Sequence, residues 1–442
     1  MASIGDRVQP IYSMNEPNET INACNEEAEL SQGGEKVLCS ARVLYRFLPK
    51  PGPVFEAVIS GPGILHADSY SVLLPQWDCR FEALITNSHL SSSSPQVVTF
   101  VATKGSLLLT RPGVCSLREV RFHLVNFPEI WSHNTDPEKR RDTVMAADGW
   151  SVEVSALAVT SSLVKKMEGM GGYAITHVGS IKRQDGSSFT PKQAEDMVGA
   201  VQHFFSFARG AWSSPILAVG VDDQGVVVWR DLSDRILHRW GFVWSWFGHM
   251  SGELLPQTFP GFMSLCKREL WHAPMQEIIH LYLESNSQSL MDVGIVLAQT
   301  ALETLSWIYC VKERKFISGE GFKDLRASDK LRMLMASLCL PLEIPKALDR
   351  VNSLAAKYHW QDGAHAFTEL RNEFIHPEHK HKGQFNEAIY EGWEMGQWYI
   401  ELALLRMFGH NGNYCNRLTQ KLASDVERVP WAEQGTAQKG KT

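Results

Sequence analysis

The chain has 442 residues, of which 44% are apolar and 21% are charged, and its net charge is −6. This length favours two or three domains over one compact core, and the composition is that of a soluble globular protein. The negative net charge excludes a polycation that coats nucleic acid through counterion release, so any contact with nucleic acid has to be local.

The cysteines and the apolar segments indicate a cytoplasmic protein. The eight cysteines include no Cys-x-x-Cys pair, which excludes a zinc ribbon or a redox dithiol and favours reduced thiols. The N-terminal residues lack the basic and apolar regions of a secretory signal. The most apolar stretch, 290–311, contains Asp292, Gln299 and Glu303, which would be costly in lipid, so we predict a buried helix and no membrane contact.

The N-terminal half is predicted to be rich in β-strands. Residues 1–36 are polar and acidic and are expected to form a flexible or loosely docked leader. From residue 37 to about 255, β-branched and aromatic runs alternate with Pro, Gly, Ser and Asn clusters, which is the pattern of an antiparallel sandwich or barrel. The runs are VLCSARVLYRF, FEAVISG, RFEALITN, VVTFVATKGSLLLT, VRFHLVNF and WSVEVSALAVT.

Two hairpins and one helix are predicted within this half. YAITHVGSIKRQDGSSFT is expected to turn at Asp185-Gly186, and PILAVGVDDQGVVVWRD is expected to turn at about 223–225. Between them, Thr190 and the proline that follows it suit the start of a helix, and Gly210 can end it.

Residues 260–425 are predicted to form an all-helical bundle, followed by a polar tail at 426–442. Apolar residues recur at spacings of three and four in LWHAPMQEIIHLYLE, LMDVGIVLAQTALETLSWIYCV, SDKLRMLMASLCL, IPKALDRVNSLAAKYHW, AHAFTELRNEFIH and FNEAIYEGWEMGQWYIELALLRMF. The expected fold class is therefore α+β, with a β-rich N-terminal domain and a helical C-terminal domain.

The segment LRNEFIHPEHKHKG, residues 370–383, carries the candidate chemistry. The apolar stripe of the helix runs through Phe367, Leu370 and Phe374. Arg371 falls about 40° from Phe367, at the margin of this stripe. A guanidinium at the edge of a core is costly unless it is paired, so Arg371 requires a partner or a role.

The histidine that follows is expected to leave the helix. Pro377 disfavours helical geometry at His376, so the helix is predicted to break there and free the imidazole. A second Arg-x4-His match, Arg118 to His123, lies in a strand-like run, where the odd offset sends the two side chains to opposite faces. We therefore predict that this second match has no such role.

The first match has the context of a known family. Arg371-Asn372 followed by His376 resembles the signature of the HEPN superfamily (higher eukaryotes and prokaryotes nucleotide-binding domains), an arginine with a histidine four to six residues later in an all-helical domain. The segment QTALETLSWIY, which contains Glu303, is similar to the long helix before the motif. The resemblance covers roughly 265–420, and a β-rich half joined to such a domain is similar to ApeA-like anti-phage defence proteins.

This resemblance implies a metal-independent endoribonuclease without a cofactor. His376 would exchange the proton of the ribose 2′-OH or of the leaving oxygen. Arg371 would bind the phosphate oxygens, and Asn372 would orient the histidine or bind the phosphate. Glu303 is a candidate supporting residue.

The resemblance also implies partners. In the family two protomers bring their motifs together, so a homodimer or a higher homo-oligomer is expected. The 2′-OH requirement predicts RNA, with tRNA as a reasonable candidate. The β-rich half would sense a trigger from a phage or a protein. Beside the motif, Lys380, His381 and Lys382 would form a basic lip for the RNA backbone.

Other interpretations of the segment remain open. His376, His379 and His381 could bind a metal, but their spacing fits no structural zinc pattern and the lysines between them would repel a cation. A structural interpretation has Arg371 paired with an acidic neighbour and His376 merely ending a helix. The rival functions are a catalytically inactive HEPN module that binds a nucleotide or a partner, and a non-enzymatic scaffold.

Two glycines predict a close helix contact. Gly392 and Gly396 lie four residues apart in an otherwise good helix, where each costs about 1 kcal/mol relative to alanine. We expect a neighbouring helix of the same chain against this face, with a dimer contact as the alternative.

Overall fold

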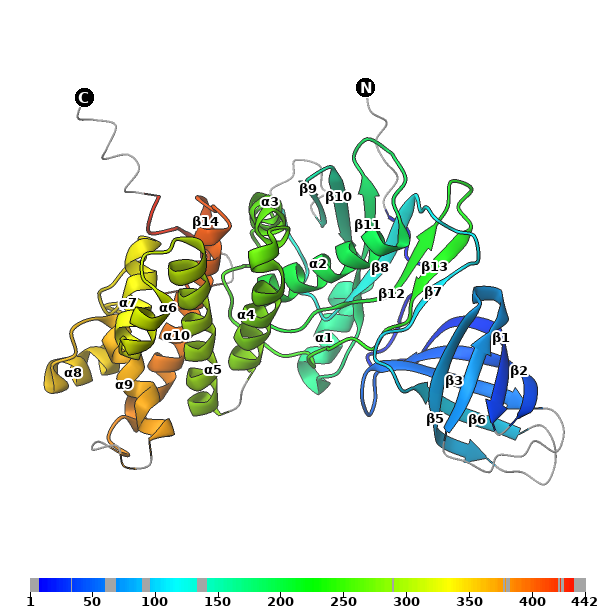
Figure 1. The fold of residues 1–442 in the computed structure, drawn as a ribbon, viewed down its shortest axis with the longest axis horizontal. Helices are drawn as coiled ribbons and strands as arrows, with labels where there is room; N and C mark the ends of the chain where they lie inside the picture. Colours follow the sequence, from blue (N-terminus) through cyan, green and yellow to red (C-terminus); the bar gives the residue numbers. More distant parts are fainter. Residues whose placement is uncertain are drawn as a thin grey trace. The chain divides into compact units, whose positions relative to one another are not determined.

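The structure, a computed structural model, describes residues 8–32, 34–59, 69–89, 96–132, 141–287, 290–376, 378, 382–419, 422 and 425–432. The chain divides into two compact units. The β unit comprises Met1–Glu129, Gly149–Gln202 and Ser213–Gly241, and the helical unit comprises Ile130–Asp148, His203–Trp212 and Phe242–Thr442. The fold class is α+β, as predicted, with a β-rich N-terminal region followed by helices (Figure 1).

A closed six-stranded barrel begins the β unit. Its strands pair in the order β1-β2-β3-β6-β5-β4, and the barrel closes where β1 pairs with β4. Inward-facing side chains fill it, including Phe55 and Phe100, whose rings stack at 5.3 Å. The strands are β1 (Ile21–Gln32), β2 (Glu35–Arg46), β3 (Gly52–Ile59), β4 (Ser69–Leu74), β5 (Cys79–His89) and β6 (Gln96–Ala102), with η1 (Pro75–Trp77) between β4 and β5.

The expectation of a flexible leader over 1–36 is wrong for the first strand. Ile21–Gln32 forms β1, which pairs with both β2 and β4. Ile21, Ala23, Ala28 and Leu30 are buried, while of the acidic residues between them Glu27 is exposed and Glu29 is half-buried. A strand with one buried face needs few large apolar residues, so its polar composition did not preclude burial.

The strands of a second sheet that belong to the β unit have the order β7-β13-β12-β8-β11-β10. Its strands are β7 (Leu108–Thr110), β8 (Glu119–Val125), β10 (Trp150–Ala156), β11 (Ile175–Arg183), β12 (Pro215–Val221) and β13 (Val227–Asp231). The predicted hairpin of β12 and β13 is confirmed. The other predicted hairpin is wrong, because β11 pairs with β10 and β8, and beyond the turn Phe189 forms only an isolated bridge with Leu117.

Two helices, rather than the single one predicted, accompany these strands. The predicted α2 (Pro191–Arg209) is confirmed, and Thr190 Oγ1 accepts a hydrogen bond from the Gln193 backbone N–H at 3.2 Å. The helix that sequence analysis missed is α1 (Thr160–Met170), which packs against β11. Its N-cap, Val159, makes no side-chain capping bond, so the usual sequence signal for a helix start is absent.

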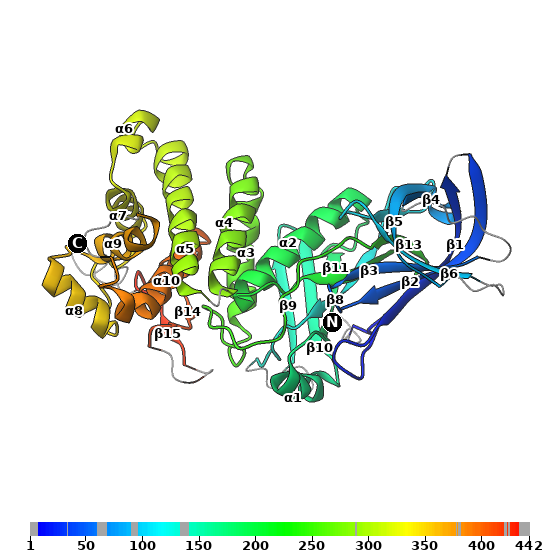
Figure 2. The same ribbon diagram turned by 90° about the horizontal axis from the view of Figure 1, so that it is seen from below.

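The helical unit is built around α5 (Met291–Ser306), which packs against α4, α7, α9 and α10 (Figures 1 and 2). The six predicted helical segments are confirmed, and α3 and α6 were missed. The elements are β9 (Asp142–Ala147), α3 (Leu254–Cys266), α4 (Glu269–Ser287), α5 with its π-helical continuation η3 (Trp307–Glu313), α6 (Gly319–Asp324), α7 (Ala327–Ser337), α8 (Asp349–Tyr358), α9 (Gly363–Ile375), η4 (Asn386–Ala388), α10 (Ile389–Met407), β14 (Asn413–Tyr414) and β15 (Glu427–Arg428).

Part of the expected tail at 426–442 belongs to this unit. β15 pairs with β14, and the side chains of Val429 and Trp431 are buried. The segment Met291–Glu313 is long and apolar enough to cross a membrane by length and composition, but half of its most apolar window is buried inside the structure. Ile295, Ala298 and Leu302 of this segment are buried, so the predicted buried helix is confirmed.

The two glycines of α10 face a helix of the same chain, as predicted. A Cβ atom added at Gly392 would lie 2.7 Å from the Leu370 side chain, and one added at Gly396 would lie 2.6 Å from the ring of Phe367. Both neighbours belong to α9. The glycines therefore let α10 approach the helix that carries Arg371.

The helical unit contains a fully buried ion pair. Arg417 Nη2 lies 2.6 Å from Glu401 Oε1, and neither side chain has any exposed area. Tyr282 also donates to Glu401 Oε1, and Asn286 Oδ1 accepts from Arg417 at 3.2 Å. The carbonyl of Trp244 accepts a further bond from Arg417 at 2.8 Å. The network thus connects α4, α10 and the segment after α10.

The second Arg-x4-His match is a pair of separated side chains, as predicted. Arg118 is half exposed, whereas His123 is fully buried in β8. The Nε2 atom of His123 accepts hydrogen bonds from the backbone N–H groups of Ile11 and Tyr12, both at 3.2 Å. Burial lowers the pKa of His123 to about 3.

This depressed pKa predicts acid sensitivity of the β unit. Between pH 6.5 and 3 the unfolded chain binds a proton at His123 that the folded chain does not. The contribution of neutral His123 to the free energy of unfolding is therefore complete above pH 6.5 and is lost as the pH falls. At pH 5 we expect a loss of about 2 kcal/mol in the free energy of unfolding. Urea unfolding at pH 7.5 and pH 5 measures this loss, and His123→Gln, which keeps an acceptor without the titration, should lose correspondingly less. Equal losses in both proteins would refute the assignment.

Candidate functional site

The site is built at the C-terminal end of α9. Asp362 caps the start of this helix, because its side chain accepts a hydrogen bond from the His365 backbone N–H at 2.8 Å, and it is paired with Arg332. It ends at Ile375, and His376 takes an extended conformation with φ −104° and ψ 106°. The predicted break at His376 is therefore confirmed.

Arg371 lies half-buried on this last turn. Its Nη1 atom donates to Asn372 Oδ1 at 3.2 Å, and its Nε atom is buried without a hydrogen-bond partner. Within the described part of the chain, no carboxylate forms an ion pair with it. The described structure thus contains no acidic partner of the kind that the structural interpretation requires.

Asn372 contacts both members of the motif. Its side chain accepts from Arg371, and its backbone carbonyl accepts the His376 N–H at 3.1 Å. The His376 imidazole is exposed, so it is open to a ligand or to a second protein surface. The end of α9 therefore presents a forked cation and a titratable ring on one short segment.

The expected basic lip is only partly described. Lys380 and His381 lie outside the described residues. Lys382 is exposed, and its Nζ atom donates to the backbone carbonyl of Glu373 at 2.6 Å. A lysine at this position satisfies a carbonyl at the helix C-terminus and adds positive charge there.

Glu303 lies on α5, a helix that packs against α9. Its side chain is half-buried, and its Oε1 atom accepts from Gln299 Nε2 at 2.8 Å. Among the described contacts, none joins Glu303 to Arg371 or His376.

Glu373 is a residue of this site that sequence analysis did not single out. It is buried, whereas Phe374, predicted for the buried stripe, is only half-buried. Its Oε1 atom accepts the Phe385 N–H at 3.3 Å, and its Oε2 atom is buried without a partner. Glu373 is covered by the segment that contains Phe385, and the periodicity of the helix does not predict a contact with a segment outside it.

A metal centre finds no donor set in the part of the chain that the structure describes, since no group of three His, Cys, Asp or Glu side chains is placed to hold an ion. Of the three histidines of that hypothesis, His379 and His381 fall outside this part.

Comparisons with known proteins place the site within a matched domain. Residues 268–428 match the YopA C-terminal domain. Residues 114–243 match the YopA central domain. The chain is also 27% identical over 403 residues to the SPbeta prophage-derived uncharacterized protein YopA of Bacillus subtilis (strain 168). The aligned region covers 87% of this chain and 89% of that protein. No solved structure matches the chain.

The match to the YopA C-terminal domain contains α9 and therefore Arg371, Asn372 and His376. The match to the YopA central domain spans most of the second sheet of the β unit. The barrel precedes both matched ranges.

Proposed function

We propose that this protein is a metal-independent endoribonuclease of the HEPN type. In this proposal the ends of α9 from two protomers form a composite site that cuts RNA in the cytoplasm, with tRNA as the first candidate substrate. His376 exchanges the proton, and Arg371 stabilises charge on the phosphate. Asn372 orients the side chains of these two residues.

The observation that carries the proposal is the state of Arg371. A half-buried guanidinium with a buried, unpartnered Nε and no described ion pair is expensive for a purely structural residue. An incoming phosphate would accept hydrogen bonds from the outer N–H groups of this guanidinium and supply the counter-charge that it lacks, because guanidinium and phosphate match in geometry and charge. The exposed imidazole of His376, released from the helix one turn away, supplies the acid–base group that strand scission needs.

The setting of the relative supports a role in conflict between phages and their hosts. The Bacillus subtilis relative is named as prophage-derived. An RNase that disables translation suits such a conflict, and the β unit would then recognise the trigger, a phage component or another protein. The negative net charge of the chain limits indiscriminate RNA binding.

RNA cleavage by the purified full-length chain tests the proposal. We expect cleavage of total tRNA and of a uridine-containing oligonucleotide in the presence of EDTA, and no cleavage of the all-deoxy oligonucleotide. Arg371→Lys, which keeps the charge but loses the fork, should cleave about 10²-fold more slowly. The matched control is Arg350→Lys on α8, an exposed arginine that contacts the Glu387 carbonyl, and it should cleave like the wild type.

Three results would contradict the proposal: no cleavage of any RNA by the wild type, cleavage that EDTA abolishes, or equal cleavage by Arg371→Lys and the wild type. The first would favour an inactive HEPN module or a scaffold. Light scattering of the active protein should show a dimer or a larger assembly, because one protomer supplies only one half of the proposed site.

A further inference from the structure

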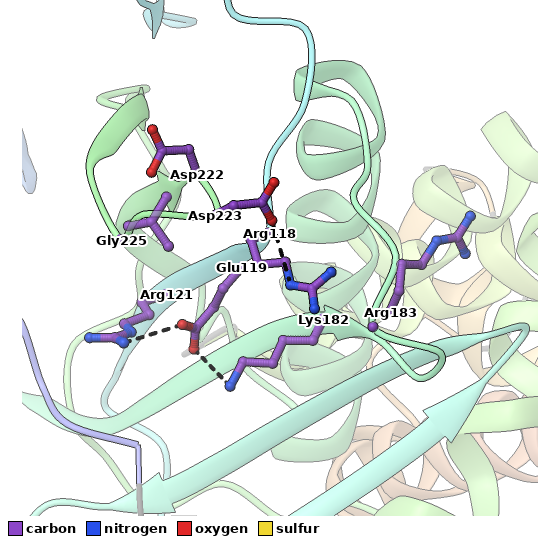
Figure 3. A pocket seen from close by; sticks show the side chains of 10 residues that line it. Arg118, Glu119, Arg121, Lys182, Arg183, Asp222, Asp223 and Gly225 are labelled. Carbon is purple, nitrogen blue, oxygen red and sulfur yellow. Dashed lines mark hydrogen bonds and ion pairs between the residues drawn. The ribbon is translucent and has the colours of Figure 1, made fainter.

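A charged pocket lies in the β unit, far along the sequence from the α9 segment (Figure 3). Its volume is about 420 Å³, and it is formed by the start of β8, the end of β11 and the turn between β12 and β13. Pockets of about 300–1,000 Å³ hold small-molecule ligands, so this one has room for a mononucleotide rather than a single ion.

Two cations of the pocket share one buried carboxylate. Glu119 Oε2 lies 3.2 Å from Arg121 Nη2, and Glu119 Oε1 lies 3.2 Å from Lys182 Nζ. The Glu119 side chain is 11% exposed, whereas those of Arg121 and Lys182 are 37% and 49% exposed. Figure 3 shows Glu119 between the two cations. One carboxylate cannot neutralise both of them, so this group presents positive charge to the pocket.

The turn between β12 and β13 supplies two more carboxylates, of which one is held by hydrogen bonds within the turn and the other is exposed. Asp222 Oδ1 accepts hydrogen bonds from the backbone N–H groups of Gln224 and Val226, both at 2.9 Å, so that oxygen is committed to the turn. Asp223 is 76% exposed, and its Oδ1 atom reaches only to 3.8 Å from Arg118 Nε. An exposed pair at this separation contributes little and exchanges readily.

Among the cations of the pocket, Arg118 therefore has the most N–H donors available to a ligand. Its fork of five N–H donors is half exposed and faces one loosely held carboxylate. Gly186, at φ +72°, leaves room for this guanidinium, since a Cβ atom there would lie only 3.3 Å from Arg118 Nη2. Arg183, whose guanidinium lies 4.1 Å from the centre of the Trp150 ring, adds a fourth cation to the lining.

We propose that this pocket binds a phosphate-bearing ligand of nucleotide size. The phosphate oxygens engage Arg118, with Lys182 and Arg121 alongside, and the ligand displaces the Asp223 carboxylate, which competes for the same guanidinium. The lining holds four cations and three carboxylates, a net charge of +1, and displacement of Asp223 from Arg118 leaves the site more positive. The site is independent of the proposed cleavage of RNA.

Binding to the full-length chain by isothermal titration tests this inference, with adenosine 5′-monophosphate, inorganic phosphate and a short oligouridylate without a terminal phosphate as probes. The oligouridylate is titrated into His376→Ala to prevent its cleavage. We expect saturable binding of at least one probe. Arg118→Gln should weaken it at least tenfold, and Asp223→Asn should strengthen it several-fold because the internal competitor has lost its charge.

The matched control is Arg42→Gln in the barrel, an arginine 53% exposed and paired with Glu56 at 2.8 Å, and it should bind like the wild type. If adenosine 5′-monophosphate binds and the oligouridylate does not, the ligand class is a free nucleotide. If the oligouridylate binds and its binding depends on Arg118, the ligand is a backbone phosphate. The inference is overturned if no probe binds saturably, if Arg118→Gln and Arg42→Gln bind alike, or if Asp223→Asn weakens binding. None of these outcomes bears on RNA cleavage.

Discussion

Replacement of His376 by alanine is expected to lower the rate of RNA cleavage by about 10²–10⁴-fold, the usual contribution of a general acid or base. The structural cost should be small, because the side chain is exposed and the hydrogen bond of this residue to Asn372 comes from its backbone N–H. Single-turnover cleavage of a uridine-containing oligonucleotide measures the rate, and urea unfolding should stay within about 0.5 kcal/mol of the wild type.

His272→Ala is the control for this variant. His272 is also an exposed histidine of the helical unit, and its Nδ1 atom lies 3.2 Å from the Cys266 carbonyl. Its loss should leave cleavage unchanged. If the two histidine variants cleave at the same rate, His376 has no chemical role and the proposed mechanism fails.

Replacement of Arg417 by methionine is expected to destabilise the helical unit by about 3–5 kcal/mol, because it leaves a buried carboxylate without its counterion. Glu401 is fully buried and would keep only the hydrogen bond from Tyr282. The double variant Arg417→Met with Glu401→Leu removes both charges and should recover most of the loss. Urea unfolding followed by tryptophan fluorescence compares the three proteins.

The surface pair of Lys192 with Glu195, at 3.0 Å on α2, is the contrast for this prediction. Lys192→Met should cost at most about 1 kcal/mol, because water already solvates the charges. If the single and double variants of the buried pair lose the same stability, the cost arises from packing and not from an unpaired charge.

The sequence predicted those elements in which apolar residues recur with the period of the helix or strand that they form. Six helices of the C-terminal half were predicted because apolar residues recur every three or four positions over long segments, whereas α3 and α6 were missed. β1 was missed because its buried face is made partly of alanines, and a register shift between Asn22 and Cys24 interrupts the alternation. Glu26 is also buried there, on the same face as Ala28 and Leu30, and a buried carboxylate is not expected from residue type.

At the candidate site, local rules predicted local geometry. Pro377 dictated the break after Ile375, and the helical angle placed Arg371 at the edge of the core. The burial of Glu373 depends on Phe385, twelve residues further on, and could not be read from the helix alone. The charged pocket was missed for the same reason, since the start of β8, the end of β11 and the turn after β12 meet only in the folded sheet.

The closure of the N-terminal barrel has a consequence for association. Because β1 pairs with β4, every described strand of the barrel has a hydrogen-bonded neighbour on each side. Fibrils and strand-exchange dimers grow by adding a strand to a row of unpaired backbone groups. The acidic first strand is thereby protected from aggregation, and a molecule that recognises the barrel has to read its outer side chains rather than extend its sheet.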